Sequence, residues 1–295
     1  MKRVHYLSSL LIAAFICSGI CIAADNQITV AGSSTIQPII EQAAKEFKKT
    51  HPDVTFVIGG GGSSHGVKAT AAGEVLLGTS SRDLNEKEMA EWKELIPTKI
   101  GMDGVAMIVN SGNPVSKITK QQIQDIYTGK ITNWKQVGGN DMPIIVVSKE
   151  EGRSTLDLFL EYSGLEAKQS EDGKTMVHRM KGSTDFCQTN ASVIGPNREA
   201  IAAVSTKPSA IAYVSVGTAQ DVATKGGHVK LLDLDGVPAS VANVANHTYP
   251  LRRPLNVVTK GAPQGTVKEF VDFLMKSEGQ QIVTSLDFIA VGNGE

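Results

Sequence analysis

The sequence has few cysteines and little net charge. Only three of its 295 residues are cysteine, and two of these, Cys17 and Cys21, lie in an apolar N-terminal segment. Without that segment Cys187 remains alone, which excludes an intrachain disulfide and a cysteine-based metal site, and we expect its thiol to be a small buried group. The formal net charge is −1, so no basic excess points to nucleic acid or a membrane surface. Any anion site must therefore be local.

Long apolar runs are also scarce, and the one present lies at the N-terminus. Lys2 and Arg3 precede apolar residues from Leu7 to about Ile22, and two small residues end at Ala24. This order is typical of a secretory signal peptide. It predicts cleavage near Ala24 and a periplasmic mature protein. A membrane anchor needs about 20 mostly apolar residues, but serines and a glycine interrupt this run. Lipid attachment is disfavoured because bulky isoleucines precede both cysteines.

Downstream, short β-branched runs alternate with one-sided helical patterns. Apolar residues of 36–47 recur at i, i+3, i+4, i+7, i+8 and i+11, and a similar stripe covers 267–274. Alternation of strands and helices predicts an α/β fold with largely parallel sheets. The expected strands are 28–32, 54–59, 74–80, 105–110, 143–148, 210–216 and 255–260.

Three segments share one design, in which a predicted strand ends in glycine and hydroxyl residues and a helix follows. They are AGSSTI (31–36), GGGGSSHG (59–66) and EEGRSTLDLF (150–159). A helix start presents unpaired backbone N–H groups and about half a positive charge. Three such starts that converge would form an anion site without a large net charge. For any single loop, helix capping by serine or threonine is the alternative explanation.

Two arginines adjoin glycine and serine residues at these strand ends. They are Arg82 in GTSSRDL and Arg153 in EGRST. A guanidinium at such a turn is a candidate for bidentate oxyanion binding, whereas a lone arginine elsewhere is usually a solvated surface group.

Two enzymatic interpretations of GGGGSSHG compete with anion binding. A P-loop requires G-x-x-x-x-G-K-[ST]. Gly61 and Gly66 have the required spacing, but Val67 occupies the lysine position and Lys68 comes one residue late. The sequence therefore argues against a nucleotide loop.

The second enzymatic interpretation is a serine hydrolase with Ser64 as nucleophile. Residues 62–66 match the G-x-S-x-G elbow, and His178, His228 and His247 follow. That elbow normally follows several strands and crossovers, whereas only about 40 mature residues precede Ser64. We therefore predict no catalytic residue, no cofactor and no metal site, and keep the exported hydrolase as an alternative.

With these residues in view, the chain resembles the phosphate-binding proteins of bacterial ABC phosphate importers. The resemblance covers nearly all of the mature chain, and DIYTGKITNW together with the three hydroxyl loops is more specific than any single motif. The matching stretches are AGSSTI, GGGGSSHGVK, GTSSRDL, MDGVAMIVN, QDIYTGKITNWKQVGG, SKEEGRSTLDLF, AIAYVSVG and YPLRRPL.

The resemblance implies a two-lobed periplasmic-binding-protein fold of type II. Each lobe would be a mixed, mainly parallel sheet flanked by helices, with the anion buried between the lobes. We expect residues 25–106 and 244–295 in lobe one and 107–243 in lobe two. The implied partners are inorganic phosphate and an ABC permease with its ATPase; the protein would act as a monomer.

Carried over by position, the resemblance implies a ligand shell of hydroxyls and arginines. Its members are Ser34, Thr35, Ser63, Ser64, Ser81, Arg82, Arg153, Ser154 and Thr155. The third loop departs from the family pattern GSGT, because Arg153 and Ser154 replace a serine and a glycine. The arginine found upstream in many members aligns with Lys149, so the charge is expected from Arg153 and Arg82.

A further departure concerns an aspartate that, in better-known members, accepts a hydrogen bond from a protonated phosphate. Here Ser81 aligns with it, and Asp103 in MDGVAM is the preferred substitute, with a turn role before Gly104 as the alternative. An unpaired carboxylate would disfavour a fully ionised oxyanion. Sulfate or molybdate binding therefore stays open, as does an adhesive anion-binding protein without a transporter.

Overall fold

The computed structural model describes residues 26–187 and 190–292. The expected signal peptide, including Cys17, Cys21 and the cleavage point near Ala24, lies outside the described residues. The strands are β1 (Gln27–Gly32), β2 (Thr55–Gly61), β3 (Leu77–Ser80), β4 (Leu95–Asn110), β5 (Lys117–Ile118), β6 (Ile145–Lys149), β7 (Leu165–Gln169), β8 (Thr175–Met180), β9 (Ala191–Ile194), β10 (Ala210–Ser215), β11 (Val229–Leu231), β12 (Asp233–Leu234), β13 (Arg252–Lys260) and β14 (Ile289–Ala290).

Helices connect most of these strands. They are α1 (Gln37–Phe47), α2 (Ser63–Ala72), α3 (Glu86–Glu91), α4 (Lys120–Tyr127), the 3₁₀ helix η1 (Trp134–Val137), α5 (Ser154–Ser163), α6 (Asn197–Thr206), α7 (Val216–Thr224), α8 (Val241–Ala245), α9 (Gly265–Met275) and α10 (Ser277–Ser285). Within residues 26–187 and 190–292, none of the helices has the length and apolar character that a membrane span requires.

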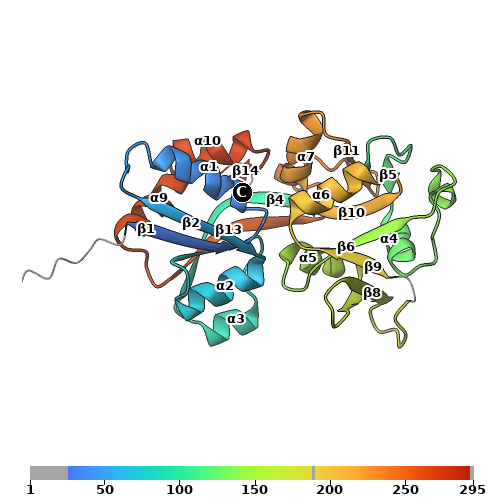
Figure 1. The fold of residues 1–295 in the computed structure, drawn as a ribbon, viewed down its shortest axis with the longest axis horizontal. Helices are drawn as coiled ribbons and strands as arrows, with labels where there is room; N and C mark the ends of the chain where they lie inside the picture. Colours follow the sequence, from blue (N-terminus) through green and yellow to red (C-terminus); the bar gives the residue numbers. More distant parts are fainter. Residues whose placement is uncertain (1–25, 188–189, 293–295) are drawn as a thin grey trace, which may run out of the picture.

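Two lobes lie side by side along the longest axis of the molecule (Figure 1). We call lobe one the part that contains β1–β3, α1–α3, α9 and α10, and lobe two the part that contains α4–α7 and β6–β10. Strand β4 joins the lobes: its first part pairs with β13 and its last part pairs with β10 and β11. The large sheet runs in the order β2-β1-β3-β13-β4-β10-β6-β9-β8-β7, with β11 and β14 also paired to β4, while β5 and β12 form a separate two-stranded sheet.

The sheets are mixed, as predicted, but less parallel than expected. Parallel pairs join β1 to β2 and β3 in lobe one, and β6 to β9 and β10 in lobe two. The pairs made by β4 and β13, and the β7–β8 hairpin, are antiparallel. The physical reason is that β4 and β13 carry the chain between the lobes in opposite directions. Local periodicity in the sequence does not report the direction of a strand's neighbour.

The helical period predicted over 36–47 is confirmed by α1, which begins at Gln37. Its buried side chains are Ile39, Ile40, Ala43, Ala44 and Phe47. Pro38 lies in the first turn, where its missing N–H removes no helical hydrogen bond. Phe270 and Leu274 of α9 pack in the same core. Each fully buried Ile, Leu or Phe side chain contributes about 1.5–3 kcal/mol.

Strand β4 is much longer than its predicted residues 105–110, because it begins at Leu95. Its first part contains Pro97, Gly101 and Gly104. Proline and glycine lower strand propensity, so the sequence pattern does not predict a strand there. Both glycines have a packing reason. A Cβ on Gly101 would lie 2.8 Å from the carbonyl oxygen of Ile289, and one on Gly104 would lie 2.7 Å from a methyl of Val244.

Candidate functional site

The three hydroxyl loops meet at one place between the lobes. Strands β1, β2 and β3 are parallel, so the loops that follow them lie at the same edge of lobe one. The loop after β6 approaches from lobe two. Helices α2 and α5 begin there at Ser63 and Ser154, whose hydroxyl oxygens are 3.0 Å apart. Two helix N-termini therefore point toward the same spot, which favours negative charge.

Buried hydroxyl groups from both lobes contact one another at this spot. Ser33 donates to Ser81 across 2.9 Å between hydroxyl oxygens, and the Ser81 and Ser154 hydroxyls are 2.6 Å apart. The Ser81 backbone N–H donates to Ser63 Oγ at 3.1 Å. We call the hydroxyl cradle the set Ser33, Thr35, Ser63, Ser81, Ser154 and Thr155, all of which are buried.

Helix capping does not explain these hydroxyls. The N-cap residues of α2 and α5 are Gly62 and Arg153, and neither side chain makes a capping hydrogen bond. Ser63 and Ser154 are the first helical residues, and their hydroxyls bond across the lobes instead. The alternative explanation from sequence was helix capping by serine or threonine. It is therefore wrong for the second and third loops.

Glycine places α2 close enough for Ser63 to reach the cradle. Gly62 has φ = 89°, a backbone region that glycine enters without strain. A Cβ on Gly66 would lie 2.7 Å from the carbonyl oxygen of Ala31 and 2.8 Å from that of Thr79. The first turn of α2 therefore packs directly on the backbone at the ends of β1 and β3.

Arg253, which sequence reasoning missed, connects the cradle to both lobes. Its Nη1 donates to Thr155 Oγ1 at 2.8 Å and to Ser154 Oγ at 3.3 Å. Its Nη2 donates to Thr35 Oγ1 at 3.0 Å and to Asp103 Oδ2 at 2.9 Å, and its Nε donates to Asp103 Oδ2 at 3.2 Å. The guanidinium is 3% exposed, so it is the cation that the cradle surrounds.

Asp103 is buried and is held by Arg253. The two residues are cross-strand partners in the β13–β4 ladder. Asp103 Oδ1 also accepts from the Gly217 N–H at 3.2 Å. The stretch YPLRRPL (249–255) does indicate a role for Arg253, because an arginine between apolar residues of a buried strand requires a charged partner.

Arg82 lies beside the cradle, and carboxylates bind its guanidinium. Its guanidinium is paired with Glu88 at 2.7 Å and approaches Asp157 of lobe two at 3.5 Å. The hydrogen bond to Glu88 raises the pKa of Arg82. Burial raises the pKa of Glu88, but the bonds from Arg82 and the Asn85 backbone outweigh it and lower that pKa. Ser64 Oγ accepts from Arg82 Nη2 at 3.1 Å.

Arg153 also lies beside the cradle. Its Nε and Nη2 donate to Glu150, at 3.0 and 2.6 Å, while its buried Nη1 has no hydrogen-bond partner among the described residues. Its side chain crosses Gly62 of lobe one, where a Cβ would lie 2.8 Å from Arg153 Cδ.

Ser34 is half-buried and lines a separate cavity of about 210 Å³ at the seam between the lobes.

Lys149 is buried behind the cradle in lobe two. Its ammonium donates to the carbonyl oxygens of Gly195 and Pro196 at 3.2 and 3.0 Å. Burial, together with the nearby positive charges of Arg153 and Arg253, lowers the pKa of Lys149 to about 7. Lys149, which aligns with a family arginine, therefore holds the loop before α6 and adds a titratable positive charge near the cradle.

Ser64 and His178, two groups that a hydrolase could use, have other partners. Ser64 accepts from Arg82, and its N–H donates to the Gly152 carbonyl at 3.2 Å. His178 is buried in lobe two with its Nε2 at 3.4 Å from Ser148 Oγ. Burial lowers the pKa of His178 to about 4, which makes it a poor base near neutral pH.

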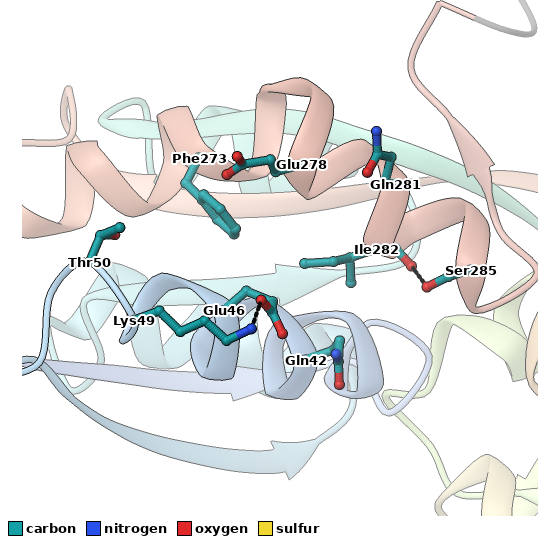
Figure 2. A pocket seen from close by; sticks show the side chains of 9 residues that line it. All are labelled: Gln42, Glu46, Lys49, Thr50, Phe273, Glu278, Gln281, Ile282 and Ser285. Atoms are coloured by element: carbon teal, nitrogen blue, oxygen red, sulfur yellow. Dashed lines mark hydrogen bonds and ion pairs between the residues drawn. The ribbon is translucent and has the colours of Figure 1, made fainter.

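A cavity of about 500 Å³ lies away from the cradle, on lobe one between α1 and α10. Figure 2 shows that Lys49 turns toward Glu46, with which it forms an ion pair of 2.6 Å, while Glu278 lies across the cavity near Phe273. The one lysine that lines it is thus already neutralised, and two carboxylates disfavour an anion there. The hydroxyl cradle remains the candidate site.

Comparison with known proteins agrees with this geometry. Residues 22–278 match a family model described as a PBP superfamily domain. The phosphate-binding protein PstS of Bacillus subtilis is 31% identical over 269 residues, which cover 91% of this chain and 82% of that protein. The chain belongs to the PBP superfamily, in the family of the phosphate-binding proteins PstS.

Solved structures of similar proteins confirm the type II fold expected for a PstS family member. A protein from Clostridium perfringens, solved with bound phosphate and described as a phosphate ABC transporter substrate-binding protein, has a TM-score of 0.75 and 34% identity, covering 90% of this chain and 99% of its own. An ABC-type phosphate transport receptor from Vibrio cholerae has a TM-score of 0.66 and 29% identity, covering 89% and 99%.

Proposed function

We propose that this chain is an exported solute-binding protein that captures inorganic phosphate in the hydroxyl cradle and delivers it to an ABC permease and its ATPase. The observation that carries the proposal is the buried Arg253 surrounded by hydroxyls from both lobes. A dehydrated oxyanion requires donors in several directions and a guanidinium with an edge that no carboxylate occupies, and Asp103 leaves the Nη1 edge of Arg253 directed at hydroxyls. Membership of the PstS family supports phosphate as that anion.

Binding in this proposal is hinge closure without a chemical step. Thr35, Ser63 and Ser81 come from lobe one, whereas Ser154 and Thr155 come from lobe two. Only the closed form lets both groups of donors contact the ligand, so binding shifts the equilibrium toward that form. The lobes are proposed to hold residues 25–106 with 244–295 and residues 107–243. The permease would recognise the closed shape of the monomer.

The energetics are sufficient for tight capture. Hydrogen bonds to charged groups contribute about 1.5–3 kcal/mol each. A micromolar dissociation constant corresponds to about 8.2 kcal/mol, so the donors of both lobes must act together to outweigh ordering and closure. In this proposal Arg253 supplies the charge, while Arg82 and Arg153 stabilise the walls through Glu88 and Glu150.

A related oxyanion is the second candidate, and one observation favours it. The carboxylate in contact with the cradle, Asp103, is held by Arg253, and Ser81 occupies the position where the resemblance expects an aspartate. A fully ionised anion such as sulfate or molybdate would then meet no unpaired carboxylate.

Calorimetry on the mature protein, first stripped of ligand, tests both candidates. Phosphate, sulfate, arsenate and molybdate would be titrated from about pH 5 to about pH 9, a range that spans the protonation states of phosphate. Preference for phosphate supports the first candidate and preference for sulfate or molybdate the second. Turnover of an ester substrate that is lost in Ser64→Ala would contradict both and support a hydrolase.

A further inference from the structure

Thr35 in lobe one receives hydrogen bonds from two side chains that lie far away in the sequence. Asn197, the first residue of α6 in lobe two, donates from Nδ2 to Thr35 Oγ1 at 2.9 Å. Arg253 donates from Nη2 to the same oxygen at 3.0 Å. Thr35 and Asn197 are each 1% exposed, so bulk water does not compete for either bond.

The valence of a hydroxyl group makes this arrangement directional. A threonine hydroxyl has one proton and two acceptor lone pairs, and its proton rotates to suit its partners. When two N–H donors occupy both lone pairs, only the proton remains for a further partner. Thr35 in the closed molecule can therefore donate to a ligand but cannot accept from one.

We infer that Asn197 is a positioning residue that completes the cradle on closure by fixing the Thr35 hydroxyl as a donor. This inference rests on the proposed binding of an oxyanion. Arg253 alone occupies one lone pair and leaves Thr35 able to accept, whereas Asn197 removes that freedom. The corner of the cradle made by Thr35 and Arg253 then selects an unprotonated ligand oxygen, and any proton on the ligand must face elsewhere.

Lobe two holds Asn197 in place by contacts that do not involve lobe one. The Lys149 ammonium donates to the carbonyls of Gly195 and Pro196, immediately before Asn197. Gly195 also packs closely on the Glu150 side chain, because a Cβ would lie 2.4 Å from Glu150 Oε2. Asn197 is thus presented by a fixed loop and meets Thr35 when the lobes close.

A double-mutant cycle distinguishes a residue that acts through Thr35 from one that contributes separately. The variants are Asn197→Ala, Thr35→Val and the double variant, each titrated calorimetrically with phosphate. We expect Asn197→Ala to weaken phosphate binding about tenfold. In the Thr35→Val background the same change should alter the affinity less than about twofold. With Thr35→Ser, which keeps the hydroxyl, the loss from Asn197→Ala should return. Additive losses would overturn the inference.

A negatively charged replacement of the amide gives a second test. A carboxylate at this position accepts only, so Asn197→Asp would draw the Thr35 proton away from the ligand. We expect at least about a 100-fold loss of phosphate affinity. Arg198→Gln is the matched control: Arg198 is exposed in the same turn and the substitution changes the net charge by the same amount. It should weaken binding less than about threefold. Equal losses of phosphate affinity in Asn197→Asp and Arg198→Gln would mean that only the change in net charge matters. That result would contradict the role of Asn197.

Failure of this inference and failure of the proposed function give different results. A wild-type protein that binds none of phosphate, sulfate, arsenate and molybdate would sink the proposed function, and the role of Asn197 with it. A wild-type protein that binds phosphate while the cycle is additive would overturn the role of Asn197 alone. Thermal unfolding of each variant identifies any that fails to fold, and Thr35→Ser with Asn197→Ala then serves as the milder pair.

Discussion

Arg253 of β13 and Asp103 of β4 face each other directly in an antiparallel ladder, with Nη2 and Oδ2 2.9 Å apart and both side chains buried. The ladder fixes where the guanidinium lies, and the carboxylate fixes how it turns. Because Asp103 engages Nε and Nη2, the Nη1 edge remains directed at Ser154 and Thr155. The strand that joins the lobes therefore also orients the positive charge of the site.

This pair allows stability and binding to be separated. Arg253→Met leaves a buried carboxylate uncompensated, so we expect a loss of about 3–5 kcal/mol in the free energy of unfolding. The double variant Arg253→Met with Asp103→Leu replaces the pair by apolar groups and should regain most of that stability. Both variants should lose phosphate binding. Urea unfolding and calorimetry measure the two effects, and a double variant that still bound phosphate would remove Arg253 from the site.

The titration of Lys149 gives a pH dependence with a definite sign. Its pKa is about 7 in the folded chain and 10.5 ordinarily. Between these values the unfolded chain binds more protons, so the contribution of Lys149 to the free energy of unfolding rises as the pH increases from about 7 to about 10.5. Below about pH 7 the full penalty of the buried charge is present. Lys149→Met should therefore flatten the rise in stability over this window, as measured by urea unfolding.

The same group should couple phosphate binding to protons. An anion in the cradle favours the charged form of Lys149, so above about pH 7 binding should be accompanied by proton uptake. Calorimetry in buffers of different ionisation enthalpy measures that uptake. Ionisation of phosphate itself contributes equally to the wild type and Lys149→Met, and the difference between them isolates Lys149. Identical proton uptake in both proteins would contradict the coupling.

Sequence patterns predicted the parts of the site that depend on local chemistry. A glycine-rich strand end followed by serines and a helix predicts donors at that helix start, and Ser63, Ser154 and Thr155 do meet there. In the first loop (SST, residues 33–35), the sequence does not specify which of the three hydroxyls face the cradle. The backbone of that loop turns Ser33 and Thr35 toward the cradle and leaves Ser34 at the seam.

The parts that were missed depend on the register of distant strands. Arg253 meets Asp103, which lies 150 residues away in the sequence, only because β13 and β4 are paired in one particular register. Asn197 meets Thr35 across the interface between the lobes. Periodicity specifies which face of an element is buried, but it does not specify which buried residue lies opposite.

The ion pair between Arg82 of lobe one and Asp157 of lobe two is expected to favour closure from outside the cradle. The distance is 3.5 Å, and Asp157 is half-exposed. Exposed pairs of this kind contribute little, so Asp157→Asn should weaken phosphate binding by at most about fivefold. Burial raises the pKa of Asp157, so its charge, and with it this contribution, is lost at a higher pH than for an ordinary aspartate as the pH falls.

Salt and scattering test this contribution. The difference between wild type and Asp157→Asn should shrink at high ionic strength, and small-angle scattering should show a more open ligand-free molecule for the variant. Asp141→Asn, an exposed change in lobe two that is paired with Lys135, is the control. If the control weakened binding equally, a general loss of charge would account for the result.

Gly66 is expected to be indispensable because α2 packs on the backbone beneath it. In Gly66→Ala the new Cβ would meet the carbonyl oxygens of Ala31 and Thr79 at 2.7 and 2.8 Å. Backbone atoms cannot move aside as a flexible side chain does, so α2 must shift, at a cost of about 1–3 kcal/mol in the free energy of unfolding. Ser63 moves with α2, and phosphate affinity should fall as well. In Gly59→Ala, within the same glycine run, the nearest atom lies at 3.6 Å, and stability should change by less than about 0.5 kcal/mol. Equal effects of the two substitutions, compared by urea unfolding and calorimetry, would mean that close packing of α2 does not position Ser63.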